Sequence, residues 1–379
     1  AIQNPNHVFS APGSYQVNLT VANESGSNSL TKTVVVSQSG TIPSNKSYVL
    51  PVVARFHGNY DSFWVSDVFL HNPNSNSDLI INFRYSYIFA NEGHTVESPF
   101  SLTLNPMQTI IIEDVLTLQF PTSGLPEDIS GMLIVDFSGS ASLPPLVAGR
   151  IDNKQADGTF GQYIPAISLL NPIRDYTDDV ILYALEQNAA FRTQLGTTNL
   201  SSEPNTVTYT VYDSSGRDVK QFQRTIGGLS NDQVSLYAYI TDEGPFTVKI
   251  HSESVLPFTS YASVSDKITS DAVFQPDVRD SDETLFLPGV THAAGSFGSN
   301  WRTDLYMHNP TPAQMVIATL LYPNSETTPQ GFTATKNYTL NAGETIVIHD
   351  VVTDILPDLT DDFVGDRKST RLNSSHVSQ

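Results

Sequence analysis

The chain has 379 residues, which is enough for three or four domains, and a formal net charge of −20 from 19 Lys and Arg against 39 Asp and Glu. The absence of cysteine excludes disulfides, thiolate metal sites and cysteine nucleophiles, and acidic residues spread along the chain argue against nucleic acid as a partner. Only 15% of the residues are charged and helix-forming runs are scarce, so we predict an all-β protein.

The sequence also bears on where the protein works. No uninterrupted apolar run approaches the ~18–20 residues that cross a bilayer, so we expect no membrane insertion in this fragment. The first residues lack an initiator Met and a leader and begin inside a domain, so we expect a fragment whose signal peptide is not included.

The first predicted element is a β-hairpin over 7–36. Alternating apolar residues from Tyr15 to Val21 indicate one strand, Asn23 to Gly26 a turn, and 31–36 the returning strand. The motif His-x-Phe, then Pro-Gly-x-Tyr-x-Val-x-Leu-x-Val-x-Asn, resembles the second half of a PKD (polycystic kidney disease) domain. The resemblance implies an immunoglobulin-like module of 1–37, common in secreted bacterial proteins, whose earlier strands are absent, so the hairpin should expose its edges.

After a linker at 38–46, the sequence repeats itself. Residues 62–73, SFWVSDVFLHNP, return as SNWRTDLYMHNP at 299–310, with six of twelve positions identical. A weaker copy, AAFRTQLGTTN, lies at 189–199. We therefore predict tandem immunoglobulin-like β-sandwich domains: unit A at 47–166, a linker at 167–179, unit B at 180–278 and a truncated unit C at 283–365.

The strands of unit A can be placed individually. Turn residues separate runs at 48–55, 64–71, 79–89, 98–104, 109–115, 131–137, 145–151 and 160–164, with a short helical turn near 116–120 and its counterpart near 352–356. The Leu-Pro opening, the Trp-x-(Ser/Thr)-Asp strand and the Asp-Val closing resemble repeats of large secreted proteins of environmental bacteria. That resemblance implies no particular activity.

The repeated aromatic residue has two interpretations. Trp64, Phe191 and Trp301 begin a strand in which alternate residues are aliphatic, which is typical of a core face, where truncating a Trp costs roughly 3–5 kcal/mol. The alternative is a platform on which sugars stack. The strand ends at Asn72, Asn199 and Asn309, whose side chains are expected to hydrogen-bond the backbone two residues on and to tolerate left-handed φ.

Motifs that carry chemistry are missing. The sequence has no Gly-x-Ser-x-Gly and no His-Glu-x-x-His. We therefore predict a chain without catalytic residues, although a glycosidase, whose carboxylates can come from distant strands, is not excluded by sequence.

Calcium is the only cofactor that the sequence gives a reason to consider. Hard cations need several oxygens in a short loop, and Asp280, Asp282 and Glu283 lie between units B and C, where an ion would stiffen the connection. The alternative is a solvated acidic surface without a cofactor.

A ligand strip is predicted on the strand at 79–89. Tyr85 has a counterpart in unit C, Tyr322, at which that strand stops, whereas Tyr87 and Phe89 extend beyond the shared part. We expect these three aromatic residues to bind a ligand or to cover a neighbouring domain.

The sequence therefore predicts a non-catalytic fragment of a secreted or surface-exposed bacterial multidomain protein. Its role would be adhesion, binding of extracellular polysaccharide or of a surface protein, or spacing. Alternatives are the accessory region of an extracellular hydrolase, a protease or glycosidase, and a repeat that itself hydrolyses glycans.

The last residues, 366–379, differ in style from the rest. The stretch DRKSTRLNSSH contains three basic residues and no strand pattern, and its back-translation resembles a common sequencing adapter. We expect this tail to lie outside the fold.

Overall fold

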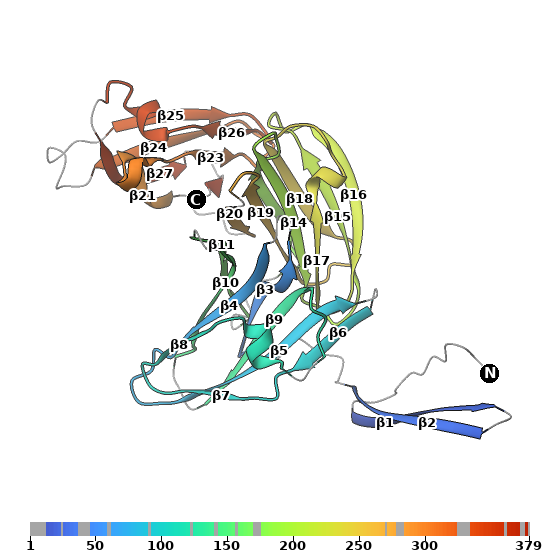
Figure 1. Cartoon of the computed structure of the whole chain (residues 1–379). Helices are drawn as coiled ribbons and strands as arrows, with labels where there is room; N and C mark the ends of the chain where they lie inside the picture. The colour runs from blue at the N-terminus through green and yellow to red at the C-terminus, as the bar shows by residue number, and fades with distance from the viewer. Residues whose placement is uncertain are drawn as a thin grey trace.

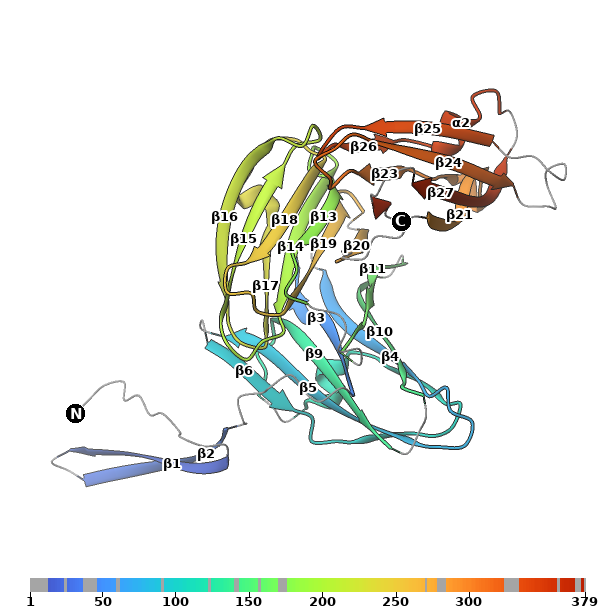
Figure 2. The ribbon, with the colours of Figure 1, turned by 180° about the vertical axis from the view of Figure 1, so that it is seen from behind.

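The computed structural model shows an all-β protein built from antiparallel sheets, with three sandwich-like units arranged in an arc and a separate N-terminal hairpin (Figures 1 and 2). It describes residues 13–23, 26–36, 46–58, 62–89, 92–121, 124–139, 143–155, 158–169, 176–269, 271–277, 284–323, 334–359, 362–371 and 376–377. The described part of the chain holds no helix that is long and apolar enough to span a membrane.

The hairpin consists of β1 (Gly13–Asn23) and β2 (Gly26–Val36). The two strands pair in one continuous antiparallel register, from Gly13 opposite Val36 to Asn23 opposite Gly26. Among the described residues no third strand joins them. Both edges are therefore unpaired there, in agreement with the sequence-based expectation.

Unit A is one ten-stranded sheet that folds over itself. Its strand β3 pairs with β9 through its first part and with β4 at its end, with a register shift between Leu50 and Val53, so that one strand connects both layers. The order is β11-β10-β4-β3-β9-β5-β6, with β12 on β3, β7 on β5 and β8 on β4. The elements are β3 (Ser47–His57), β4 (Phe63–His71), β5 (Leu79–Phe89), β6 (Glu92–Glu97), β7 (Leu102–Leu104), β8 (Thr109–Ile112), α1 (Val115–Gln119), β9 (Ile129–Ser138), β10 (Leu146–Gln155), β11 (Gly158–Pro165) and β12 (Ile167–Ser168).

Unit B is a sandwich of two four-stranded sheets, in the orders β13-β18-β15-β16 and β17-β14-β19-β20. The inner faces of the two sheets share one hydrophobic core. The elements are β13 (Val180–Leu185), β14 (Phe191–Asn199), β15 (Asn205–Tyr212), β16 (Asp218–Ile226), β17 (Ser230–Ser235), η1 (Leu236–Ala238), β18 (Phe246–Ser252), β19 (Phe258–Asp266) and β20 (Ala272–Pro276).

Unit C has a five-stranded sheet, β22-β21-β27-β24-β25, and a three-stranded sheet, β26-β23-β28. It has its own core. The elements are β21 (Thr284–Ala294), η2 (Ser296–Gly298), β22 (Asn300–Arg302), β23 (Leu305–His308), β24 (Met315–Pro323), β25 (Ala334–Leu340), β26 (Thr345–Ile348), α2 (Val351–Ile355), β27 (Phe363–Arg371) and β28 (His376–Val377).

Two expected boundaries differ from the structure. The linker after unit A was expected to begin at Ile167, but Ile167 and Ser168 form β12 and pair with β3. The tail was expected to lie outside the fold, but 366–371 continue β27 and pair with both β21 and β24. In each case the segment lies beside a strand whose backbone N–H and C=O groups it can pair with. Such backbone hydrogen bonds form regardless of the side chains.

Units A and C share the turn that leads into their short helices. The carboxylate of Asp67 accepts the backbone N–H of Asp114 at 2.9 Å, and Asp304 accepts that of Asp350 at the same distance. Asp114 and Asp350 are both left-handed, with φ of 42° and 51°. The repeated strand Asp therefore holds a strained residue at the start of α1 and α2.

The repeated asparagine is the hydrogen-bonding centre of each unit. Asn72, Asn199 and Asn309 are fully buried. In each, Oδ1 accepts the backbone N–H two residues on, which is the contact that the sequence suggests, and Nδ2 donates to three carbonyls. The carbonyls are those of Ser77, Leu104 and Asn105 in unit A, Glu203, Ile226 and Gly227 in unit B, and Ala313, Leu340 and Asn341 in unit C. None of the three adopts the left-handed φ that we had expected.

Units A and B are packed through apolar side chains, unlike units B and C. Tyr261 and Phe274 of unit B pack in the core of unit A. A second cluster joins Val49, Met132 and Ile134 of unit A to Leu200 and Leu229 of unit B, with Leu169 and Tyr176 against it. Such burial contributes roughly 1.5–3 kcal/mol per large side chain, so it fixes how the two units sit against each other.

The contact between units B and C is mainly polar. Thr247 and Thr345 share a hydrogen bond of 2.8 Å, and the rings of Tyr183 and His308 stack at 5.8 Å. Gly216 lies so close to the backbone of Gly343 that a Cβ would meet its carbonyl at 2.8 Å. In the described residues no hydrophobic cluster spans this contact.

Candidate functional site

The predicted ligand strip on β5 is not available to a ligand. Tyr85 is fully buried and donates its hydroxyl hydrogen to the carbonyl of Val53 at 2.9 Å, and burial raises the pKa of that hydroxyl. Tyr87 is only 8% exposed and stacks between Tyr85 and the ring of His94 on β6. The prediction of a ligand strip was wrong for these two residues, because Tyr85 lies in the core of unit A and the ring of Tyr87 is covered by His94. The Phe89 side chain lies outside the described residues.

The predicted calcium ligands Asp280, Asp282 and Glu283 also lie outside the described residues. Elsewhere in the described chain, no group of three or more His, Asp or Glu side chains is arranged to hold a metal ion. The calcium prediction therefore stays untested.

The repeated aromatic residues differ in burial. Trp64 is half-buried, stacks on Phe56 at 6.4 Å between ring centroids, and donates from Nε1 to the hydroxyl of Ser62. Trp301 is 62% exposed, so the expectation of a core residue was wrong there. In unit A the strand β10 pairs with Trp64 through Asn153, whereas in the described part of unit C only β21 pairs with Trp301. Phe191 is half-buried.

Two carboxylates, Asp67 on β4 and Asp152 on β10, lie on neighbouring strands of unit A. Asp152 on β10 is fully buried, its oxygens accept no hydrogen bond from the described residues, and Arg150 is 3.7 Å away. Burial and the charge of Asp67 raise the pKa of the Asp152 carboxyl, although Arg150 and Lys154 oppose this. A carboxyl with no exposed surface cannot touch a substrate, so this pair does not form a glycosidase site.

A cleft of about 640 Å³ lies between units A and B. We call it the A–B cleft. The end of β3 in unit A lies beside the sheet of β14, β17 and β19 of unit B (Figure 1), and residues of both line the cleft. The lining residues from unit A are Val52, Ala54, Phe56, His57, Gly58, Ser62, Trp64, Ser130, Ile151 and Gln162, and those from unit B are Arg192, Gln194, Gln233, Tyr261, Ser263, Ser265, Lys267 and Ala272.

Strand alternation in unit B explains why one face of its sheet is polar. Residues of β14 that point to the core of unit B, such as Leu195, alternate with Arg192 and Gln194, which line the cleft. The register places Arg192 opposite Ser265 and Gln194 opposite Ser263. Cross-strand partners share a face, so these four polar residues form one surface on the side of unit A.

Farther along the same face, the sheet contacts unit A directly. The ring of Tyr261 lies over Gly196, where a Cβ would come within 2.0 Å of the ring, so only glycine fits. Thr198 and Asn231 donate to the carbonyl of Pro51 of unit A at 3.0 Å each. This packing fixes unit B against unit A beside the cleft.

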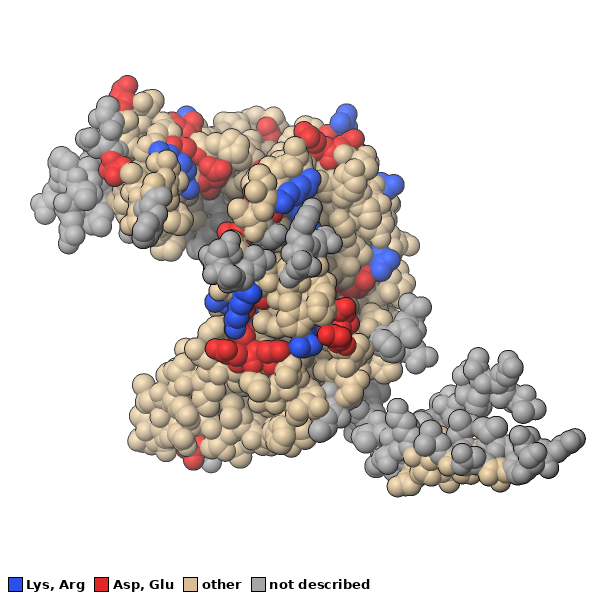
Figure 3. Space-filling view, viewed as in Figure 1, with Lys and Arg blue, Asp and Glu red and all other residues tan. Residues whose placement is uncertain are grey.

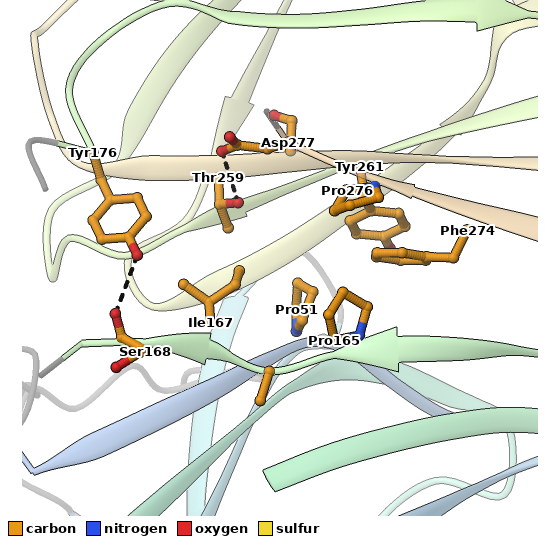
Figure 4. A pocket seen from close by; sticks show the side chains of 12 residues that line it. Pro51, Pro165, Ile167, Ser168, Tyr176, Thr259, Tyr261, Phe274, Pro276 and Asp277 are labelled. Atoms are coloured by element: carbon orange, nitrogen blue, oxygen red, sulfur yellow. Dashed lines mark hydrogen bonds between the residues drawn. The ribbon is translucent and has the colours of Figure 1, made fainter. Parts of the chain in front are cut away.

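A smaller pocket of about 300 Å³ lies on the other side of this contact. In Figure 4 the stacked rings of Tyr261 and Phe274 face Pro51 and Pro165. Its polar residues are already paired: Thr259 donates to Asp277 at 3.0 Å, and Tyr176 to the carbonyl of Ser168 at 3.1 Å. This pocket therefore offers fewer free polar groups than the A–B cleft.

Charge on the surface gathers in small groups. On the face seen in Figure 3, Lys and Arg lie in separate clusters, several of them beside Asp and Glu, with wide uncharged areas between them. No continuous basic stripe of the kind that tracks a phosphate backbone crosses this face.

Only part of the cleft could be recognised from local sequence patterns. Gln194 is next to Leu195 on the repeated strand, so alternation puts it on the face opposite the apolar one, but Arg192 and Lys267 carry no motif. Their role depends on how unit B packs against unit A, which no local pattern reveals.

Residues 1–37 match the model of the PKD domain, in agreement with the resemblance of the hairpin motif. No curated protein is similar enough to the chain to count as a relative. The match and the all-β fold fit an extracellular accessory region, since PKD domains are typically extracellular.

Proposed function

We propose that the chain is a non-catalytic region of a secreted or surface-exposed bacterial protein and that it attaches this protein to carbohydrate through the A–B cleft. The observation that carries the proposal is the composition of the cleft, which combines the indole of Trp64 with amide, hydroxyl and cationic side chains in a volume of about 640 Å³. The role is compatible with an adhesin and with the accessory region of an extracellular hydrolase.

The chemistry of sugars explains why this combination matters. A sugar ring presents apolar C–H faces, which pack on an aromatic ring, and hydroxyl groups at its edge, which need hydrogen-bond partners. Ligand sites usually lie between domains, have volumes of roughly 300–1,000 Å³ and hold a few polar groups at fixed positions. Gln194 suits this role because the described part of the chain offers its side chain no hydrogen-bond partner.

Absence of catalysis is part of the same proposal. The buried Asp67 and Asp152 pair has no access to the cleft, and among the described residues no Asp or Glu lines it. A glycosidase needs an acid and a base or nucleophile on either side of the bond that is cleaved.

The proposal can be tested with the purified chain and a panel of insoluble and soluble polysaccharides, in pull-down and affinity electrophoresis. Trp64→Ala should abolish retention, and Gln194→Ala should weaken it by about tenfold, the equivalent of one good hydrogen bond. Trp301→Ala is the matched control, because Trp301 occupies the corresponding turn of unit C away from the cleft, with Gly295 and Ser299 in place of Gly58 and Ser62.

Retention of a polysaccharide that survives both Trp64→Ala and Gln194→Ala would place carbohydrate binding elsewhere on the chain. Lack of retention by every polysaccharide would leave the role of a spacer. Release of reducing sugar from any of them would contradict the non-catalytic role.

A further inference from the structure

The A–B cleft has an unusual charge for this chain. The whole sequence holds 39 acidic against 19 basic residues, yet the described residues that line the cleft include Arg192 and Lys267 and no carboxylate. A cavity with cations and low-dielectric walls concentrates its field and attracts anions.

Two carboxylates near these residues already have partners. Asp128 pairs with His57 at 2.9 Å, and His57 and Asp128 are both well exposed. Asp266 precedes Lys267, but its Oδ1 accepts the backbone N–H groups of Ile268 and Thr269 at 2.8 and 2.6 Å. The ammonium group of Lys267 donates to the carbonyl of Asn188. No described carboxylate therefore neutralises Lys267.

Arg192 is the strongest indication of a ligand. Its side chain is half-buried, and its Nε is fully buried and has no hydrogen-bond partner among the described residues. A buried donor left unpaired costs roughly 1–3 kcal/mol. In the described chain the guanidinium also forms no ion pair, unlike Arg224, which pairs with Asp232 through two hydrogen bonds of 2.7 and 3.1 Å.

A carboxylate can pair with the terminal Nη groups of Arg192, which, unlike Nε, are not buried and form no hydrogen bond with the described residues. Two oxygens in one plane match the planar guanidinium fork, and hydrogen bonds between charged partners are about twice as strong as neutral ones. Lys267, on the same wall of the cleft, provides a second positive charge, and Trp64 on the opposite wall provides a surface for a sugar ring.

We propose that the A–B cleft selects acidic polysaccharides, with the carboxylate of a uronic acid residue bound by Arg192 and attracted by Lys267. This inference rests on the proposed function and adds the ligand class. Ester formation on the uronate carboxyl should remove the attraction, because the ester is neutral.

The test uses the full chain and pairs of polymers that differ in charge alone. Isothermal titration calorimetry and affinity electrophoresis would compare polygalacturonate with its highly methyl-esterified form, add alginate as a second uronate, and include a sulfated and a neutral glucan. We expect binding to a uronate polymer that falls at least about tenfold on esterification, the worth of one charged hydrogen bond, and that weakens as salt is raised.

Two substitutions assign the effect to residues. Arg192→Gln should lower uronate affinity by about tenfold or more and leave any binding of the esterified polymer unchanged. Lys267→Gln, at an exposed position, should lower the uronate affinity by a smaller factor. It provides a second probe if Arg192→Gln reduces folding. Arg217→Gln is the control, since Arg217 is exposed and pairs with Asp213 in a turn that does not line the cleft.

The outcomes separate this inference from the proposed function. Equal affinity for the charged and esterified polymers, lost with Trp64→Ala and insensitive to Arg192→Gln, would overturn the acidic specificity and keep carbohydrate binding. A preference for the sulfated over the uronate polymer would overturn the assignment to a carboxylate. No binding to any polymer would overturn both.

Discussion

Replacing Asn199 by Asp should strongly destabilise unit B at neutral pH. The exchange keeps the shape of the side chain and the acceptor for the N–H of Ser201, at 2.9 Å. It replaces Nδ2, which donates to the carbonyls of Glu203, Ile226 and Gly227 at 2.7, 3.2 and 2.8 Å, by an oxygen. Three carbonyl dipoles would then face a negative charge in a fully buried site.

The cost follows from those contacts. The two short hydrogen bonds of Nδ2, to the carbonyls of Glu203 and Gly227, are lost at about 1 kcal/mol each. The uncompensated buried charge adds to this, so the free energy of unfolding should fall by roughly 3–5 kcal/mol in total. A protonated carboxyl can donate to one of the carbonyls, so the folded state favours the proton and the pKa of the introduced group rises above its usual value of about 3.9. The penalty should therefore be complete at neutral pH and shrink as the pH falls through the raised pKa.

Hydrogen exchange on peptides from β15 and β16, read by mass spectrometry at pH 7 and pH 5, measures this locally. Unit B contains neither of the two Trp residues, so tryptophan fluorescence would not report on it. Gln221→Glu is the control, an identical amide-to-carboxylate exchange at an exposed position of β16. A loss below about 1 kcal/mol in unit B, or a loss that does not change with pH, would refute the importance of the Nδ2 bonds.

Three further changes test other parts of the structure. Gly196→Ala should destabilise the chain by about 1–3 kcal/mol and loosen unit B from unit A, because the new Cβ would overlap the ring of Tyr261; an unchanged melting temperature would show that the ring can move freely. Asp152→Asn should stabilise unit A by about 1 kcal/mol at pH 7, because it removes a buried charge. Since the pKa of this carboxyl is raised in the folded state, the gain in stability should vanish below pH ~4, where the wild-type carboxyl is neutral. Denaturant titrations at both pH values measure the gain, and an equal gain at each would be inconsistent with a charge effect. Tyr87→Ala should lower stability by roughly 2–4 kcal/mol and leave polysaccharide binding unaltered, since Tyr87 is buried; loss of binding in a stable variant would restore the predicted strip.

Local sequence patterns predicted most strands of unit A, although β6 at Glu92–Glu97 was missed. The alternation in β4 and the turn after Asn72 gave the correct element, and the short helix near Leu116 was predicted from a few residues. Such features depend on neighbours in sequence, whose period of two or turn chemistry is directly visible.

Exposure was harder to predict than secondary structure. Tyr87 extends beyond the part of β5 shared with unit C, which suggested a free surface, but His94 on the next strand covers it. Trp301 repeats Trp64 in sequence, yet its exposure depends on the strand that pairs beside it. Arg192 and Lys267 meet Trp64 only through the packing of two units, which is a contact between distant residues that a single sequence does not encode in any local pattern.

The unequal contacts within the arc have a mechanical consequence. Tyr261 and Phe274 of unit B can leave unit A only if a hydrophobic core opens, whereas units B and C meet mainly through polar side chains and the backbones of Gly216 and Gly343. Under tension along the chain, the B–C contact should therefore yield first and act as a hinge, while the A–B pair transmits force as a stiff body. A ligand in the A–B cleft would therefore stay bound while the remainder of the chain extends.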